Sequence, residues 1–128
     1  MFAELHCLTH FSFQRGASRP EELVSTAKAL GYKALAITDE CSLAGVVKAH
    51  VAAKAENLQL IIGAEFRLQS EEYGETHVVL LAPDQHAYIE LCNLITRGRR
   101  RAEKGSYQLR LDDLYHCRKH CLCIWLPE

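Results

Sequence analysis

Ionisable side chains recur at or near the ends of predicted strands, in a mixture of types that could bind a divalent metal ion. They are His6, the pair Asp39 and Glu40, and Glu65. Imidazole nitrogens and carboxylate oxygens can hold divalent ions, which generate hydroxide and neutralise phosphoryl oxygens. These residue types could therefore form a metal site. On spacing alone a second interpretation is equally open, in which Asp39 and Glu40 cap the following helix and Glu65 is solvated.

The elements that would position these side chains alternate between strand and helix. Short apolar runs predict strands over residues 4–8, 34–38 and 58–68, and helical spacing predicts helices over 18–31 and 43–56. Strands joined by short helical crossovers favour a mainly parallel α/β sheet with helices outside. Such sheets carry their chemistry at the carboxyl ends of the strands. Three successive strands would therefore deliver the ionisable residues to one rim.

Both predicted helices carry local signals. Ser18 and Glu21 have the spacing of a capping box at the start of the first helix. Gly31 can adopt the left-handed conformation after its end. In the second helix, Val47 and Val51 are expected to face inward.

The rest of the chain predicts further elements. A fourth strand over 77–82 follows the turn-rich "SEEYGE", and His77 at its start is expected to lie away from the rim and to be structural. Asp84 can cap a long helix. A short helix over 111–117 and a last strand over 121–126 complete the pattern. The apolar residues that recur at helical spacing in the long helix are Tyr88, Leu91, Leu94 and Ile95.

Length and composition bound the class of protein. The chain has 128 residues, 48% of them hydrophobic and 24% charged, with a formal net charge of -1. This is typical of one soluble globular domain, and any contact with nucleic acid requires a local basic patch. Glu4 and His6 interrupt the N-terminal apolar residues, so no signal peptide is expected, and no run approaches the roughly 20 apolar residues of a membrane span. We expect a cytoplasmic protein with reduced thiols at Cys7, Cys41, Cys92, Cys117, Cys121 and Cys123.

The segment "HCRKHCLC", residues 116–123, contains cysteine and histidine pairs four residues apart. It lacks the CxxC and zinc-finger spacings that characterise structural zinc sites. Strand alternation would bury Cys121 and Cys123 as small apolar residues. Structural packing is therefore favoured over metal binding.

Five motifs together resemble one family. The segments "ELHC", "FSFQRGAS", "ALAITDECSLAGVV", "LIIGAEF" and "HVVLLAPD" are similar to the PHP (polymerase and histidinol phosphatase) domain at the N-terminus of bacterial C-family DNA polymerases, above all of the error-prone branch. The resemblance runs through nearly the whole chain and is strongest over residues 3–66. It implies an incomplete, distorted β/α barrel. Residues 1–128 would form the N-terminal part of the PHP domain in a much longer chain.

The resemblance also implies a metal cluster, whose first ligands this sequence retains only in part. Metal-binding members carry His-x-His on the first strand; His6 matches the first histidine, but Leu8 occupies the second. The next ligand position falls at Gln14 or Arg15, neither of which is a metal ligand. His10 lies past the strand end and is not expected to repair the site.

The second and third strands retain more of the pattern. Asp39 matches, Glu40 replaces the histidine that follows it, and Glu65 matches. We expect a vestigial site in which His6, Glu40 and Glu65 are the remaining ligands, with Asp39 beside them. No tightly bound cofactor is expected, and at most weak binding of Mg²⁺ or Mn²⁺.

A cluster of cations near the end of the long helix has two interpretations. Its side chains could complement the helix dipole in solvent, or contact DNA phosphates or a neighbouring polymerase domain. No aromatic residues are interleaved, which argues against base stacking on single strands. The cluster comprises Arg97, Arg99, Arg100, Arg101 and Lys104.

The resemblance implies that the parent chain is a Mg²⁺-dependent DNA polymerase acting in damage-induced mutagenesis and translesion synthesis. Its catalytic carboxylates would lie beyond residue 128, so the present chain is expected to be structural and inactive by itself. Expected partners are DNA, other polymerase domains and mutagenesis accessory proteins, with no membrane. Unpaired strand edges predict self-association of the isolated chain. The alternatives are a metal-dependent phosphoesterase or 3′–5′ exonuclease of the PHP superfamily, and a protein-binding module.

Overall fold

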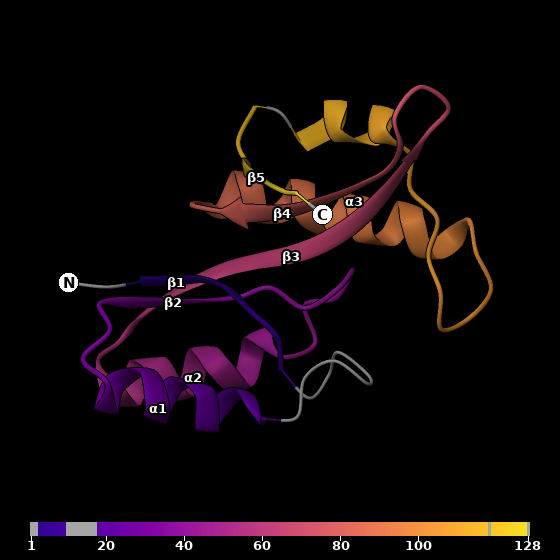
Figure 1. The fold of residues 1–128 in the computed structure, drawn as a ribbon. Coiled ribbons are helices and arrows are strands. Elements are labelled where there is room, and N and C mark those ends of the chain that lie inside the picture. Colours follow the sequence, from indigo (N-terminus) through magenta and orange to yellow (C-terminus); the bar gives the residue numbers. More distant parts are fainter. Residues whose placement is uncertain (1–2, 10–17, 118, 128) are drawn as a thin grey trace.

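The computed structural model describes residues 3–9, 18–117 and 119–127, so the predictions for His10, Gln14 and Arg15 concern residues outside the described part. Its strands form one curled sheet in the order β1-β2-β3-β4-β5, with helices packed on its outer side (Figure 1). The elements are β1 (Ala3–Cys7), α1 (Pro20–Ala29), β2 (Ala34–Ile37), α2 (Val46–Glu56), β3 (Gln59–Ser70), β4 (Gly74–Ala82), α3 (Gln85–Arg100), the 3₁₀ helix η1 (Leu111–Cys117) and β5 (Leu122–Leu126).

The sheet is mixed in strand direction. β1, β2 and β3 are parallel, as predicted, whereas β3 pairs antiparallel with β4, and β4 with β5. The reason is the short connection after β3, where Ser70 pairs with Gly74 in a tight hairpin. Antiparallel neighbours need only such a turn, while parallel neighbours need a long crossover. The predicted class, an incomplete β/α barrel, is confirmed, but the expected parallel direction holds only for the first three strands.

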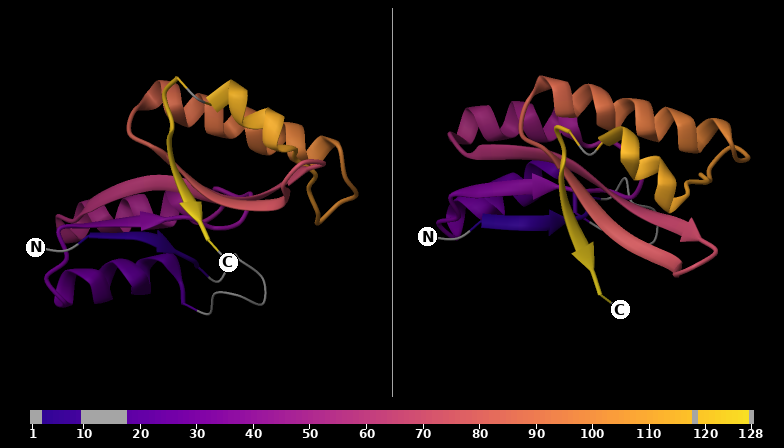
Figure 2. Two further views of the ribbon diagram at one scale, coloured as in Figure 1. Left: turned by 45° about the horizontal axis from the view of Figure 1, so that its top comes forward. Right: turned by 90° about the horizontal axis from the view of Figure 1, so that it is seen from above.

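The long strand β3 runs from the part of the sheet beside α1 and α2 to the part beside α3, and it curves along its length (Figure 2). Leu60 packs with the apolar core of α1 and α2, while Ala64 and Phe66 pack with α3. These residues alternate along one strand and therefore share one face. The helices thus cover the outer face of the sheet. On the inner face, Ala36 of β2 packs with Val79 of β4 across the curl.

The helix signals were correct in part. Asp84 caps α3, since its Oδ1 accepts a 2.8 Å hydrogen bond from the Ala87 amide. Gly31 adopts a φ of 79°, as predicted. The capping box is wrong, because α1 begins one residue later than a Ser18 cap requires and its N-cap, Arg19, makes no capping side-chain bond.

Helix α2 faces the core with different residues from those predicted. Val47 and Val51 are 71% and 63% exposed, whereas Val46, Ala49 and Ala53 are buried. The helix begins at Val46, and its small residues at spacings of three and four let it pack closely against its neighbours. The prediction that Val47 and Val51 face inward is therefore wrong.

The C-terminal half follows the predicted order. Leu91 and Leu94 of α3 are buried, and Tyr88 and Ile95 pack against the same core. None of the helices in the described ranges is long and apolar enough to cross a membrane.

Candidate functional site

The inner face of the sheet brings two histidines onto one buried carboxylate. Glu65 of β3 is fully buried, and its Oε2 lies 2.8 Å from Nε2 of His6 on β1. Its Oε1 makes a hydrogen bond with Nε2 of His77 on β4. The three side chains tie together β1, β3 and β4. We refer to His6, Glu65 and His77 as the His–Glu–His cluster.

His77 is a site residue that sequence reasoning missed. Because β4 runs antiparallel to β3, its start lies beside the carboxyl end of β3, and His77 pairs with Arg67. The prediction that His77 lies away from the rim is therefore wrong. The signal was the turn-rich stretch before it, which predicts a hairpin rather than a crossover.

Asp39 is held by the segment after β1. It is 1% exposed, its Oδ1 accepts a 2.7 Å hydrogen bond from the Thr9 amide, and its Oδ2 accepts one of 2.6 Å from the Thr9 hydroxyl. Gly45 lies against the same pair, since a Cβ there would sit 3.2 Å from Asp39 Oδ2. Asp39 thus joins two segments and does not cap α2, whose N-cap is Gly45.

Glu40 is directed to a different set of partners. Its backbone bridges to Glu65, yet its Oε2 accepts a 2.5 Å hydrogen bond from the Tyr107 hydroxyl and lies 3.5 Å from Arg67 Nε. The Tyr107 hydroxyl in turn accepts a 2.9 Å bond from the Arg67 amide. Burial and the hydrogen bond to Glu40 raise the pKa of Tyr107. Glu40 therefore anchors the connection that follows α3.

Among the residues that the structure describes, the donors do not fit the metal cluster that the resemblance implies. Of the predicted ligands, His6 and Glu65 meet, whereas the Glu40 carboxylate is committed to Tyr107 and Arg67. Leu8 offers no lone pair to a metal. Within the described residues, no group of three or more His, Cys, Asp or Glu is arranged to hold a metal ion. The arrangement binds carboxylates to protein donors instead.

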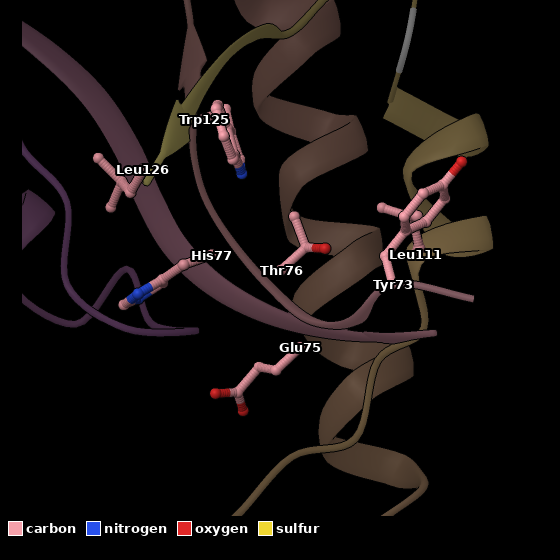
Figure 3. Close-up of a pocket in the computed structure, with 7 residues that line it drawn as sticks. All are labelled: Tyr73, Glu75, Thr76, His77, Leu111, Trp125 and Leu126. Atoms are coloured by element: carbon pink, nitrogen blue, oxygen red, sulfur yellow. The ribbon is translucent and has the colours of Figure 1, made fainter. Parts of the chain in front are cut away.

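A cavity of about 560 Å³ opens beside the His–Glu–His cluster (Figure 3). In the close-up, His77 and Leu126 lie on one side and Tyr73 and Leu111 on the other, with Thr76 between them. The wall is completed by Glu75 and Trp125.

The predicted basic cluster is partly committed to contacts within the chain. Arg101 Nη1 lies 2.7 Å from Asp113 Oδ2, and Arg97 Nη1 lies 3.6 Å from Asp113 Oδ1. Arg99 donates to the Cys41 and Ser106 carbonyl oxygens, each at 3.0 Å. These three arginines hold the connection after α3.

The remaining members of the basic cluster, Arg100 and Lys104, have exposed side chains. For these two residues, the predicted contact with DNA or another domain stays a prediction.

The charge of Asp113 depends on these arginines. Burial raises the pKa of Asp113, but hydrogen bonds from the Arg101 side chain and the Arg110 amide, with the charges of Arg101 and Arg97, outweigh it and lower that pKa. Asp113 is thus a stable anion that binds η1 to α3.

The cysteine–histidine segment packs against α3. The Cys117 and Cys121 thiols donate to the carbonyl oxygens of Glu90 and Ala87, at 3.8 and 3.4 Å. His120 Nδ1 lies 2.6 Å from Glu90 Oε2. Cys123 is exposed on the outermost strand, so its predicted burial is wrong.

These features define the class of protein. The PHP domain family matches residues 4–124, and the chain belongs to that family. Error-prone DNA polymerases of Pseudomonas aeruginosa and Methylococcus capsulatus are 57% and 56% identical over 99% and 100% of this chain, and that of Idiomarina loihiensis is 52% identical over 100%. The chain spans about 12% of the length of these relatives.

Solved structures show the same architecture. A protein of Bifidobacterium adolescentis described by its name as a metal-dependent phosphoesterase superposes with a TM-score of 0.59 and 28% identity, over 79% of this chain and 35% of that one. A sulfate-bound, metal-free amidohydrolase of Chromobacterium violaceum superposes with a TM-score of 0.62 and 25% identity, over 78% and 34%.

Proposed function

We propose that the chain is part of the N-terminal PHP domain of a cytoplasmic error-prone DNA polymerase. The observation that carries this is identity of 52–57% to error-prone DNA polymerases over nearly the entire chain. The parent enzyme would transfer deoxynucleotides to a primer end, with Mg²⁺ bound by carboxylates outside these residues. Its role would be translesion synthesis and damage-induced mutagenesis, with DNA, other polymerase domains and mutagenesis accessory proteins as partners.

Within that polymerase, the PHP portion would be a structural domain. Glu65 makes hydrogen bonds with two imidazoles, and Asp39 accepts hydrogen bonds from Thr9. Glu40 accepts a hydrogen bond from Tyr107 and pairs with Arg67. Hydrogen bonds that involve an ionised group are stronger than neutral ones, and removal of one partner leaves a buried group unsatisfied. These contacts join β1, β3, β4 and the connection after α3. The site would therefore stabilise the half-barrel where metal-binding relatives coordinate ions.

The experiment is primer extension by the longer polymerase that contains this domain. We expect Mg²⁺-dependent nucleotide incorporation on an undamaged template and across an abasic site. Absence of incorporation on both templates would contradict the proposal. Incorporation only on the undamaged template would contradict the translesion role.

A metal-dependent phosphoesterase or 3′–5′ exonuclease is the second candidate. The phosphoesterase-like neighbour and the two imidazoles on Glu65 favour it. The test is hydrolysis of phosphomonoesters and DNA 3′ ends by the longer polymerase with Mn²⁺, Mg²⁺ or Zn²⁺, compared with His6→Ala. We expect the unaltered polymerase and the His6→Ala variant to show the same background of hydrolysis. Turnover lost in His6→Ala with nucleotide incorporation retained would show that the site still works.

A matched variant asks whether ligand loss explains the inactivity that we expect. Leu8→His with Glu40→His restores the histidines of the metal-binding pattern that the resemblance implies. If ligand loss is the cause, the double variant should gain metal-dependent hydrolysis. Continued inactivity of this variant would point to another cause.

A further inference from the structure

The outer helix layer has a gap between α2 and α3. The chain passes from β2 through α2 to β3, but β3 and β4 are joined by a hairpin without a helix. A groove of about 510 Å³ lies at this place, between helices that Figure 1 shows at opposite ends of the curl. Most of its wall is apolar: Val46, Val47, Leu60, Ile62, Ala82, Pro83 and Tyr88 line it, with His50, Asp84 and Gln85.

An exposed stripe of α2 borders the groove, and two of its residues, Val47 and His50, line the wall. Val47, His50, Val51 and Lys54 recur at the spacing of one helical face, and all four are exposed. The two valines are 71% and 63% exposed. Exposed valines beside an apolar groove are the arrangement in which amphipathic helices dock.

The charges on α2 indicate which kind of helix the groove would bind. Lys48 and Lys54 are exposed on α2 beside the groove, His50 lines it, and the only acidic residue of α2 is Glu56 at its end. Asp84 also lines the groove, but its Oδ1 accepts a hydrogen bond from the Ala87 amide at the start of α3. A docked helix with carboxylates beside its aliphatic face would complement these cations. A basic helix would be repelled.

We propose that the groove between α2 and α3 docks an acidic amphipathic helix from the part of the polymerase that lies outside this chain. The proposal rests on the proposed function, because the chain spans about 12% of its polymerase relatives and the remainder supplies the occupant. The docked helix fills the gap in the outer layer and covers Val47 and Val51.

The test is photo-crosslinking in the longer polymerase, with p-benzoylphenylalanine in place of Val51. The expected result is a cross-link within one molecule, from position 51 to a segment outside residues 1–128 that contains aliphatic and acidic residues. Leu30 is a matched control, since it is 64% exposed at the end of α1 and does not line the groove. The same replacement at Leu30 should not give this cross-link.

A pair of charge variants tests whether the docked helix is negatively charged. Val47→Glu should reduce the cross-link yield from position 51 several-fold, and Val47→Lys should reduce it less. Absence of a cross-link, cross-links confined to residues 1–128 or to a second molecule, or a larger loss with Val47→Lys would overturn the proposal. Primer extension with the same preparations separates the two ideas, because nucleotide incorporation without the cross-link leaves the proposed function standing and removes the docking site.

Discussion

Leu8 and Glu40 are the positions at which this chain departs from the metal-binding pattern that the resemblance implies. Leu8 removes a ligand, whereas Glu40 acquires a role of its own through Tyr107 and Arg67. The neighbouring carboxylates remain buried, and burial of a charge is costly unless the charge is hydrogen-bonded. Thr9, His6 and His77 satisfy them. At the scale of residues, Thr9, His6 and His77 make hydrogen bonds with the carboxylates that the resemblance matches to metal ligands.

The His–Glu–His cluster predicts a stability effect. We expect His77→Ala to lower the free energy of unfolding by about 1–3 kcal/mol, because the buried Glu65 carboxylate loses a hydrogen bond. The measurement is urea unfolding. The control is Lys33→Ala, at an exposed position before β2, which should change stability by less than about 0.5 kcal/mol. Equal effects of the two variants would show that the His77 contact does not stabilise the fold.

At the scale of elements, the connection after α3 is held against the sheet by several independent contacts. Arg99 and Tyr107 stack as a cation–π pair at 5.5 Å, and the Gln69 amide donates to the Leu109 carbonyl at 3.0 Å. Asp113 links η1 to α3. These contacts explain why most of the basic cluster faces its own chain.

Helix α3 approaches this connection closely at Gly98. A Cβ on Gly98 would lie 2.9 Å from Leu109 Cγ, and Leu109 is 1% exposed. Gly98→Ala should therefore destabilise the protein by about 1–3 kcal/mol through overpacking, despite the higher helix propensity of alanine. Thermal or urea unfolding measures this.

A double-mutant cycle identifies the cause. In a Leu109→Ala background, where the opposing side chain is shortened, Gly98→Ala should cost less or become stabilising. An equal cost in both backgrounds would mean that contact with Leu109 is not responsible.

The ion pairs of Asp113 predict a pH dependence. Its pKa in the folded protein is lowered from the ordinary value of 3.8, so its contribution to stability is present above that value and is lost as the pH falls through the lower folded pKa. Asp113→Asn should thus be less stable than the parent chain at neutral pH, with the difference shrinking in acid. Urea unfolding across pH, with the exposed Asp112→Asn as control, measures this. A difference that grows in acid would have the wrong sign.

At the scale of the whole molecule, the described part is a half-barrel with open sides. β1 and β5 are the outermost strands of the sheet. Leu122 and Trp125 of β5 are 57% and 66% exposed. Exposed strand edges with apolar side chains promote association with another chain.

We therefore expect the isolated 128-residue chain to form dimers or larger assemblies. Analytical sedimentation over a range of concentrations measures this. Leu122→Lys with Trp125→Lys should shift the chain toward monomer, because lysine on an edge strand opposes pairing. A clean monomer of the unaltered chain at high concentration would contradict the prediction.

What the sequence determined by itself is the set of local elements and the family. The parallel strands β1 to β3, the cap Asp84 and the left-handed Gly31 were predictable because apolar periodicity and capping depend on residues close together in the chain. His6 and Glu65 were candidate partners because parallel strands deliver their ends to one rim.

Only the tertiary structure decided which partners those residues have. His6 meets Glu65 across 59 residues, and Glu40 meets Tyr107 across 67. His77 joins them because a hairpin reverses β4, and α2 buries alanines because the surface it packs against favours close approach. Such choices depend on strand direction and on the packing of segments distant in sequence. A local sequence pattern specifies a helix or strand and the residues that can share one face of it. The segments that pack against that element determine which of those residues form a site.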